Sequence, residues 1–303
     1  MSKRLQWLTF LMLHVTRQWL AAPKDVFRAR KDFESSSRFA RVAPYLLHVS
    51  ERGTPDLHYL SVRRGNAGKV VLYFHGGAYV MGSARTHLAP LSRLARLTGL
   101  QIVVPDYRLA PEHPAPAAFQ DAVAAHVALL AKGYQPQDII LGGDSAGGGL
   151  ALALMADLCA RNLRPAGLFA FSPWTDFAMS GDSLRRNAAI DPALPVGRMR
   201  ETVDLVLPGF PPQDPRISPL YAPFNAPPPV FVQVGAEEIL LDDSFRMAQV
   251  LRDAGGQVTC DVWNGCPHVW HMLDGYIPEA RAALVATAAF VATLQALVPI
   301  ANR

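Results

Sequence analysis

The stretch DIILGGDSAGGG, residues 138–149, decides the fold of this chain of 303 residues. It opens with a short β-branched, apolar run typical of a buried strand, and from Ala146 to about residue 161 the chain is apolar and of helical length. Between the two runs, GDSAG (143–147) matches G-x-S-x-G, which sets a serine on a sharp turn flanked by very small residues. We therefore predict that Ser145 is a nucleophile on a strand-to-helix turn. The alternative is a glycine-rich helix start that serves only close packing.

Strand-like and helix-like segments alternate along the chain on both sides of this motif. The strand-like runs lie at 69–74, 99–105, 138–141, 167–172, 230–234 and 258–263. The helix-like segments lie near 86–98, 117–132, 146–161, 243–254 and 278–297. This alternation predicts an α/β fold with a mostly parallel central sheet flanked by helices, preceded by antiparallel strands around His48 and at 57–62.

Two segments, about 1–43 and about 179–219, fall outside this alternation. The second is rich in proline and charge and contains no clear strand. No long polar linker separates either segment from the rest of the chain. We expect both to be helical pieces that pack as a cap over the carboxyl edge of the sheet, within a single domain of residues 1–303.

The composition is that of a globular protein, with 50% apolar and 18% charged residues. The formal charge is +4, and neither a dense basic stripe nor a nucleic-acid-binding motif accompanies it, so we expect no nucleic-acid partner. Three cysteines without regular spacing argue against a disulfide framework. Cys266 lies two residues before His268, but residues so close in sequence rarely reach the geometry of a Cys–His nucleophile pair.

The N-terminus combines a basic start with a largely apolar run at 5–15, as signal peptides do. Gln6, Thr9 and His14 interrupt that run, and only Ala21-Ala22 offers a weak cleavage site. Apolar residues recur there at helical spacing: Trp7, Leu8, Leu11, Val15 and Trp19. We therefore expect an amphipathic helix of a mature, cytoplasmic protein, too short to span a membrane and capable at most of weak membrane contact.

A glycine-rich loop, His75-Gly76-Gly77-Ala78, follows the strand-like run at 69–74. Such a loop offers unobstructed backbone N–H groups to the oxygen that becomes negative in a tetrahedral intermediate. The N–H of Ala146, directly after the nucleophile, is a further candidate donor. We expect His75 to brace this loop rather than to act as the general base.

The general base is expected late in the chain, after the last strand of the sheet. His268 lies in the loop 264–271 that follows the last strand-like run, and the tight turn 265–267 can present its ring. Histidine suits this role because its pKa lies near the working pH. His271 is the nearest competitor.

The carboxylate behind the histidine is expected after the strand-like run 230–234. Four acidic residues stand there: Glu237, Glu238, Asp242 and Asp243. Glu238 lies on the loop beyond the strand end, from which a side chain can reach His268, whereas Asp242 and Asp243 resemble helix caps. We predict Glu238, which gives the chain order serine, acid, histidine.

Five stretches together resemble the hormone-sensitive-lipase-like (family IV) branch of the α/β-hydrolases. They are HGGAYVMGS (75–83), DYRLAPEHPAPAAFQDA (106–122), GDSAGGG (143–149), GAEEILLDD (235–243) and PHV (267–269). The resemblance implies an α/β-hydrolase core, a helical cap, and a serine carboxylesterase that hydrolyses short- to medium-chain acyl esters without a cofactor or metal. The family's catalytic triad falls on Ser145, Glu238 and His268. Its oxyanion donors fall on Gly76, Gly77 and Ala146, with Ala78 as a close alternative.

Two positions depart from the family pattern. Ala78 stands where the family loop often has a third glycine, and because alanine keeps its N–H we expect activity to survive. Many members carry aspartate as the triad acid within D-P-L-x-D, where this chain has Glu238 and, four residues later, Asp242. Glutamate is the longer side chain, so the choice between these two residues stays open.

Several functional alternatives use the same residues. A lipase, or an amide or lactone hydrolase, would share the triad, and the sequence does not separate them from an esterase. A non-catalytic small-molecule receptor is disfavoured because such receptors lose the histidine base. Five aromatic residues either line substrate pockets or belong to the ordinary core: Tyr79, Trp174, Phe177, Phe210 and Trp270. We expect a small-molecule ester as substrate, and a homodimer is an open alternative to a monomer.

Overall fold

A computed structural model describes residues 1–17, 25–39, 41–62 and 68–296. Its eight-stranded sheet has the order β1-β2-β4-β3-β5-β6-β7-β8. The strands are β1 (Leu47–Glu51), β2 (Asp56–Ser61), β3 (Val70–Phe74), β4 (Gln101–Asp106), β5 (Ile139–Asp144), β6 (Gly167–Phe171), β7 (Val230–Gly235) and β8 (Val258–Trp263). The first two pairings, β1 with β2 and β2 with β4, are antiparallel, and the rest are parallel. The predicted mostly parallel sheet with leading antiparallel strands is confirmed.

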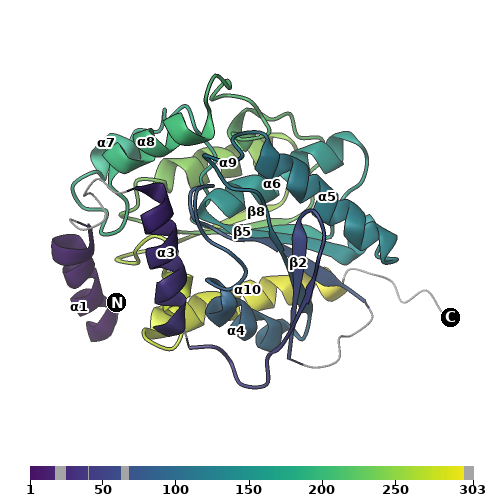
Figure 1. Cartoon of the computed structure of the whole chain (residues 1–303), viewed down its shortest axis with the longest axis horizontal. Helices are drawn as coiled ribbons and strands as arrows, with labels where there is room; N and C mark the ends of the chain where they lie inside the picture. Colours follow the sequence, from purple (N-terminus) through teal and green to yellow (C-terminus); the bar gives the residue numbers. More distant parts are fainter. Residues whose placement is uncertain (18–24, 40, 63–67, 297–303) are drawn as a thin grey trace.

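Helices cover both faces of this sheet (Figure 1). One face is covered by α4 (Leu88–Thr98) and α10 (Pro278–Ala296), and the other by α5 (Ala117–Ala131), α6 (Ser145–Ala160) and α9 (Leu241–Asp253). The sequence of β3 shows why two layers form, because successive strand residues point to opposite faces. Val70, Leu72 and Phe74 join the core beneath α5 and α6, whereas Val71 and Tyr73 join the core beneath α4 and α10.

Most of the remaining helices lie outside the alternation of strands and helices, in the N-terminal segment and between β6 and β7. The N-terminal segment contains α1 (Lys3–Leu11), a π-helix (Met12–Thr16), α3 (Val26–Ser36) and a 3-10 helix (Ser37–Phe39). Residues 172–229, between β6 and β7, contain α7 (Ser183–Arg186), α8 (Val196–Val206) and a 3-10 helix (Pro219–Tyr221). We call residues 172–229 the insertion. Two more 3-10 helices, Pro136–Asp138 and Trp270–Leu273, precede β5 and α10.

The N-terminal helix forms where the sequence predicts it. Leu5 is fully buried against Trp270 and Ile277, whereas Trp7 is 66% exposed. Trp7 therefore does not contribute to the buried face of this helix. Trp19, Ala21-Ala22 and the side chain of Val15 lie outside the described residues. Within the described part of the chain, no helix is both long and apolar enough to cross a membrane.

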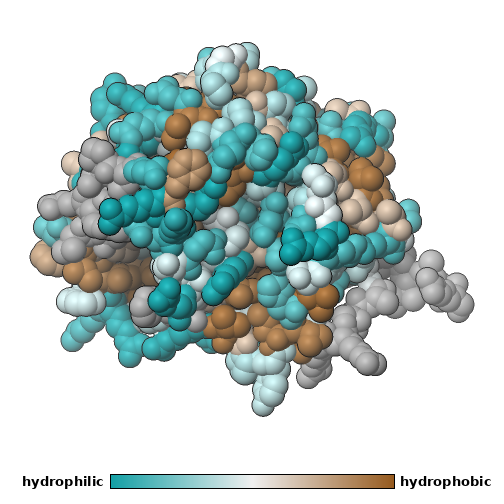
Figure 2. All heavy atoms as spheres, in the orientation of Figure 1, coloured by the Kyte–Doolittle hydropathy of each residue, from teal (hydrophilic) through white to brown (hydrophobic). Residues whose placement is uncertain are grey.

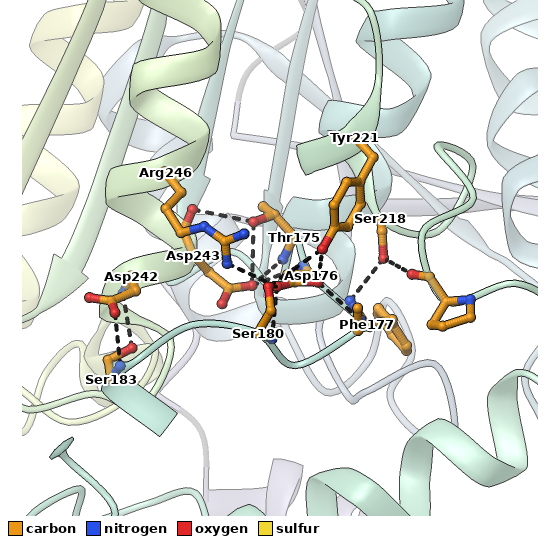
Figure 3. A network of polar contacts seen from close by, with 12 residues as sticks. Thr175, Asp176, Phe177, Ser180, Ser183, Ser218, Tyr221, Asp242, Asp243 and Arg246 are labelled. Carbon is orange, nitrogen blue, oxygen red and sulfur yellow. Dashed lines mark hydrogen bonds and ion pairs between the residues drawn. The ribbon is translucent and has the colours of Figure 1, made fainter. Parts of the chain in front are cut away.

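A polar network fastens the start of the insertion to α9 (Figure 3). The carboxylate of Asp243 accepts hydrogen bonds from the backbone N–H groups of Thr175 at 2.7 Å and Asp176 at 2.9 Å. Asp176 in turn accepts from Tyr221 at 3.0 Å and pairs with Arg246 at 2.9 Å. The expectation that Asp243 caps its own helix was wrong, because its side chain is used to hold a segment nearly seventy residues earlier in the chain.

Candidate active site

Ser145 stands at the junction of β5 and α6, in the turn that its motif predicts. Its φ of +52° lies in the left-handed region, which costs a non-glycine residue roughly 1–2 kcal/mol. The turn also packs very closely against its neighbours. A Cβ on Gly147 would lie 2.1 Å from the carbonyl oxygen of Phe74, and one on Gly143 would lie 2.3 Å from that of Gly147. Only glycine fits at these two positions. The left-handed backbone conformation of Ser145 makes the sharp turn between β5 and α6.

His268 bridges Ser145 and Glu238. Its Nε2 lies 2.9 Å from Ser145 Oγ, and its Nδ1 lies 2.6 Å from Glu238 Oε2. The other carboxylate oxygen of Glu238 accepts from Ser172 Oγ at 2.7 Å and from the Gly235 N–H at 2.6 Å. Glu238 is fully buried. The structure thus brings together the three residues that the sequence selected from different parts of the chain.

The competing acid, Asp242, lies elsewhere. Its carboxylate accepts from the Ser183 N–H at 2.8 Å and from Arg186 at 2.9 Å (Figure 3). These contacts join the first turn of α9 to α7, so Asp242 neither contacts His268 nor caps its own helix. The alternative that the sequence left open between Glu238 and Asp242 is settled geometrically in favour of Glu238 as the partner of His268.

The electrostatics of His268 favour a protonated ring more than burial alone would allow. Burial by itself lowers the pKa of His268, but the charge of Glu238 and its hydrogen bond outweigh burial and raise the pKa above its ordinary value. The carboxylates of Asp191 and Asp144 act in the same direction. A ring that binds a proton readily at Nε2, with a carboxylate behind Nδ1, can take a proton from the Ser145 hydroxyl.

Two other candidates for the chemistry occupy unsuitable surroundings. His271 is fully buried and stacks on Phe171 at 3.8 Å, and burial lowers its pKa to about 3. Burial raises the pKa of Cys266 to about 12, so its thiol stays protonated at neutral pH. Neither His271 nor the Cys266 thiol therefore offers a reactive group.

His75 lies in the loop after β3 with its ring stacked on Tyr107 at 4.3 Å. It is 1% exposed, and burial together with the neighbouring His87 lowers the pKa of His75 to about 4. A neutral, buried ring in a stacked contact fits the expected bracing role. The hydroxyl of Tyr107 adds a hydrogen bond of 2.6 Å to the His75 carbonyl oxygen.

The loop after β3 requires one correction to the predicted oxyanion donors. The Gly76 N–H donates to Asp144 Oδ1 at 2.9 Å, so it is already used inside the protein and was wrongly assigned as a donor to the substrate. The following residues make a tight turn, with φ of +123° at Gly77 and +56° at Ala78. Gly77, Ala78 and Ala146 are the candidate donors that remain.

Most of the aromatic residues considered as pocket linings are core residues. Tyr79 and Trp174 are 2% exposed, Phe177 is 1% exposed and Trp270 is fully buried. Trp174 and Phe177 stack on each other at 3.9 Å between ring centres. Phe210 is partly buried, with the guanidinium of Arg216 over its ring at 4.9 Å.

Sequence reasoning missed several residues that support the site. Asp144 holds Gly76 and accepts from Tyr73 OH at 2.8 Å, and its place inside the G-x-S-x-G motif was the signal available. Ser172, Asn187 and Asp191 belong to the insertion, where no periodic pattern or spacing could have pointed to them. In the described residues, no group of three or more His, Cys, Asp or Glu side chains is arranged to hold a metal ion.

Comparisons with known proteins agree with this geometry. A family model described as the alpha/beta hydrolase fold matches residues 71–272. An esterase of Acinetobacter venetianus is 39% identical over 237 residues, which cover 76% of this chain and 77% of that protein. An acetyl-hydrolase of Streptomyces hygroscopicus is 38% identical over 75% of this chain and 76% of its own length.

Solved structures give the same result over almost the whole chain. The crystal structure of an esterase from the bacterial hormone-sensitive lipase family is 35% identical, with a TM-score of 0.91, and covers 97% of this chain and 99% of that one. EstE5, solved after soaking with p-nitrophenyl butyrate, is 32% identical, with a TM-score of 0.90 over 98% of this chain and all of that one. The chain belongs to the hormone-sensitive-lipase-like branch of the α/β-hydrolase fold family, and it is a carboxylic ester hydrolase.

Proposed function

We propose that this enzyme hydrolyses esters through an acyl-enzyme, with Ser145 as nucleophile, His268 as general base and Glu238 as the carboxylate that orients His268. One observation carries the proposal. The two ring nitrogens of His268 lie within hydrogen-bond distance of Ser145 Oγ and Glu238 Oε2, at 2.9 and 2.6 Å. This is the arrangement that nucleophile, base and orienting acid need for acyl transfer.

The proposed reaction has two halves. Ser145 Oγ attacks the ester carbonyl carbon while His268 Nε2 takes its proton, and the carbonyl oxygen becomes an oxyanion facing N–H donors from Gly77, Ala78 and Ala146. The C–O bond to the alcohol then breaks, and the imidazolium gives its proton to the leaving oxygen. In the second half, water attacks the acyl-enzyme by the same route and releases the acid and free Ser145.

We further propose that the N-terminal segment and the insertion form a cap that limits the enzyme to short- and medium-chain acyl groups. Contacts with the body of the enzyme support this. Arg30 of α3 donates to the carbonyl oxygens of Val80 at 3.0 Å and Ala110 at 3.1 Å, which places α3 against the loop that carries the oxyanion donors. Arg17 donates to the Ala189 carbonyl oxygen of the insertion at 3.1 Å. Relatives named acetyl-hydrolase, and EstE5 with its butyrate ester, are consistent with small acyl groups.

Nitrophenyl esters from acetate to laurate test the proposal directly. We expect highest kcat/KM at acetate to hexanoate, and loss of turnover by at least about 1,000-fold in Ser145→Ala. A fluorophosphonate should label the wild type at one site per chain and leave Ser145→Ala unlabelled. Full turnover in folded Ser145→Ala would contradict the mechanism, and amide or lactone turnover exceeding ester turnover would contradict the substrate class.

We also propose that the N-terminal helix makes loose contact with an anionic membrane surface. Leu5 packs inward and Ser2 Oγ bonds to Glu279 at 2.9 Å, while Trp7 and Phe10 remain 66% and 62% exposed. Figure 2 shows a hydrophobic patch over α1 at the left edge of the molecule, beside the hydrophilic surface of α3.

Residues 1–43 contain nine Lys or Arg and three Asp or Glu, a net +6, although the whole chain carries only +4. Exposed aromatics among basic residues favour anionic interfaces. A cytoplasmic location and a homodimer stay predictions of the sequence.

A further inference from the structure

We propose that Asn187 and Asp191 of the insertion are positioning residues, which hold the Glu238 carboxylate against His268 by clamping the peptide unit that follows Glu238. This inference rests on the proposed role of Glu238 in the reaction. It also assigns the insertion a part in catalysis itself, in addition to covering the site.

The clamp consists of two hydrogen bonds to the two ends of one peptide unit. Asn187 Nδ2 donates to the Glu238 carbonyl oxygen at 2.8 Å, and the N–H of Ile239, the other end of the same peptide, donates to Asp191 Oδ2 at 2.8 Å. Ser183 adds a third contact by donating from its hydroxyl to the Ile239 carbonyl oxygen at 2.7 Å. A peptide plane held at both its C=O and its N–H cannot rotate. The Glu238 N–H also donates to the Gly235 carbonyl oxygen at 3.2 Å, so the backbone is held on both sides of the Glu238 Cα and the direction of its Cα–Cβ bond is restricted.

The clamp is rigid because it is buried. Asn187 is 4% exposed, and Asp191, Glu238 and Ile239 are fully buried. The two clamping side chains are joined to each other through the backbone, where the Asp191 N–H donates to the Asn187 carbonyl oxygen at 2.9 Å. The second carboxylate oxygen of Asp191 accepts from the N–H groups of Ala193 at 2.7 Å and Leu194 at 2.9 Å.

Asp191 is an unusual choice for a purely structural contact. Its three hydrogen bonds all come from backbone N–H groups, and no Lys or Arg in the described residues forms an ion pair with it. A buried carboxylate without a cation is costly, and burial, followed by the nearby charge of Glu238, raises the pKa of Asp191. The cost of burying the Asp191 carboxylate is explained if its charge contributes to the function of the site.

That use is electrostatic support of His268 during the reaction. The charged groups that act on His268 are Glu238, Asp191 of the insertion and Asp144 before the nucleophile, and all three raise the pKa of His268. His271, on the same loop, stays neutral because burial lowers its pKa to about 3. Asp191 thus both holds the Glu238 peptide and adds a second negative charge near the imidazolium.

Asp191→Asn tests the clamp, because it removes the charge and replaces one of the two acceptor oxygens by an NH2 group. The amide can then no longer accept from all three N–H groups as the carboxylate does. We expect kcat on p-nitrophenyl butyrate to fall roughly 10- to 100-fold, as expected for misplacement of a catalytic group, while KM changes less than about 3-fold. We also expect the acidic limb of the kcat/KM profile to move to lower pH, because the loss of a negative charge lowers the pKa of His268.

Asp214→Asn is the control, since it removes a carboxylate from the same insertion, and the partners of that carboxylate, the backbone N–H and the guanidinium of Arg216, lie outside the clamp. It should keep the wild-type pH profile and a kcat within about 3-fold of wild type. If Asp191→Asn were folded and kept both the wild-type kcat and the wild-type acidic limb, the proposal would be wrong. A fall in thermal stability alone, with an unchanged pH profile, would also overturn it by making Asp191 merely structural.

Asn187→Ala provides a second variant should Asp191→Asn fail to fold. It frees the Glu238 carbonyl oxygen and leaves the charge of Asp191 in place, so we expect a similar loss of kcat with a smaller shift of the acidic limb. An unchanged kcat in folded Asn187→Ala would count against the clamp. Labelling by a fluorophosphonate separates this result from failure of the mechanism: slowed labelling in the clamp variants concerns the clamp, whereas turnover by Ser145→Ala concerns the mechanism.

Discussion

At the scale of single residues, His268 determines how the enzyme should respond to pH. In the proposed mechanism the ring must be neutral to accept the Ser145 proton, and Glu238 raises the pKa of His268 although burial opposes it. Activity should therefore be present above this raised pKa and be lost as the pH falls through it. We expect kcat/KM to fall tenfold per pH unit on the acidic side, with an apparent pKa above about 6.5. A profile whose acidic pKa lay well below 6.5 would contradict the assignment of Glu238 as the partner that raises the pKa of His268.

Gly76 is a residue at which a single methyl group should disturb the site without altering the Ser145 turn itself. A Cβ on Gly76 would lie 2.1 Å from Asp144 Oδ2, and the Gly76 N–H is bonded to that same carboxylate. Gly76→Ala should push the loop away from the Ser145 turn and lower kcat roughly 10- to 100-fold. Gly68→Ala is the control, since no atom lies within 4 Å of its added Cβ, and it should behave as wild type. Equal kcat values for the two variants would contradict this account of the loop.

At the scale of elements, α5 carries a buried histidine that should make the protein sensitive to acid. His126 is 1% exposed, and neither of its ring nitrogens has a hydrogen-bond partner in the described residues. Burial, followed by the charge of Arg161, lowers the pKa of His126 to about 4. As the pH falls, the unfolded chain therefore binds a proton at His126 near pH 6.5, whereas the folded protein binds it only near pH 4. Between these two pH values protonation favours the unfolded chain, so the free energy of unfolding decreases as the pH falls.

His126→Leu should remove the part of the pH dependence of the unfolding free energy that comes from His126. The free energy of unfolding is measured in urea at about pH 8 and about pH 5. We expect its decrease between these two pH values to be about 1–2 kcal/mol smaller in the variant than in wild type. His75 and His271 have lowered pKa values as well, so some acid sensitivity should remain. Identical pH dependence in the two proteins would show that His126 is hydrated or paired in solution.

The same element scale shows how the insertion is joined to the fold. Asp243 binds Thr175 and Asp176 at the start of the insertion, Asp242 binds Ser183, and Asp191 binds Ile239, so contacts from α9 and the loop before it recur along the insertion. Each contact pairs a side chain with a backbone group from a distant part of the chain. The insertion and the loop that carries Glu238 therefore form one polar layer, and motion of one should displace the other.

At the scale of the whole molecule, the uneven charge distribution predicts how the enzyme meets a lipid surface. The first 43 residues carry net +6, so the other 260 carry net −2. We expect wild-type protein to cosediment with phosphatidylglycerol vesicles more than with phosphatidylcholine vesicles, and less so at high salt. The double variant Trp7→Ser/Phe10→Ser should bind anionic vesicles at least about 10-fold more weakly.

Phe245→Ser supplies the control for that measurement, because Phe245 is 45% exposed but lies on α9. It should bind vesicles as wild type does. Equal binding by all three proteins would contradict a membrane role for α1. A mass that depends on protein concentration without lipid, and that is lost in the double variant, would instead make Trp7 and Phe10 part of a contact between two copies of the chain.

Much of this fold could be predicted from the sequence because the signals are local. The strands β3 and β5 are continuous apolar runs, and the helix that follows Ser145 is apolar along its length, so their type follows from burial on both sides. Most boundaries agree to within about two residues, but β5 ends at Asp144, three residues beyond the predicted end at Leu141. The helix at α1 was also predicted, but its inward residue was not, because several apolar residues occur there and only packing against Trp270, Ile277 and α10 selects Leu5.

The sequence by itself determined the sheet, the turn at Ser145 and the positions of His268 and Glu238 relative to their strands, because chain order and strand ends bring these residues to one edge of the sheet. Only the tertiary structure decided that Glu238 rather than Asp242 contacts His268, that Asp144 occupies the Gly76 N–H, and that the insertion grips the peptide after Glu238. The physical reason is the range of the interactions. Hydrophobic periodicity depends on residues that are close in sequence, whereas these hydrogen bonds join groups some thirty to seventy residues apart. A displacement of one ångström between donor and acceptor would change which groups are bonded.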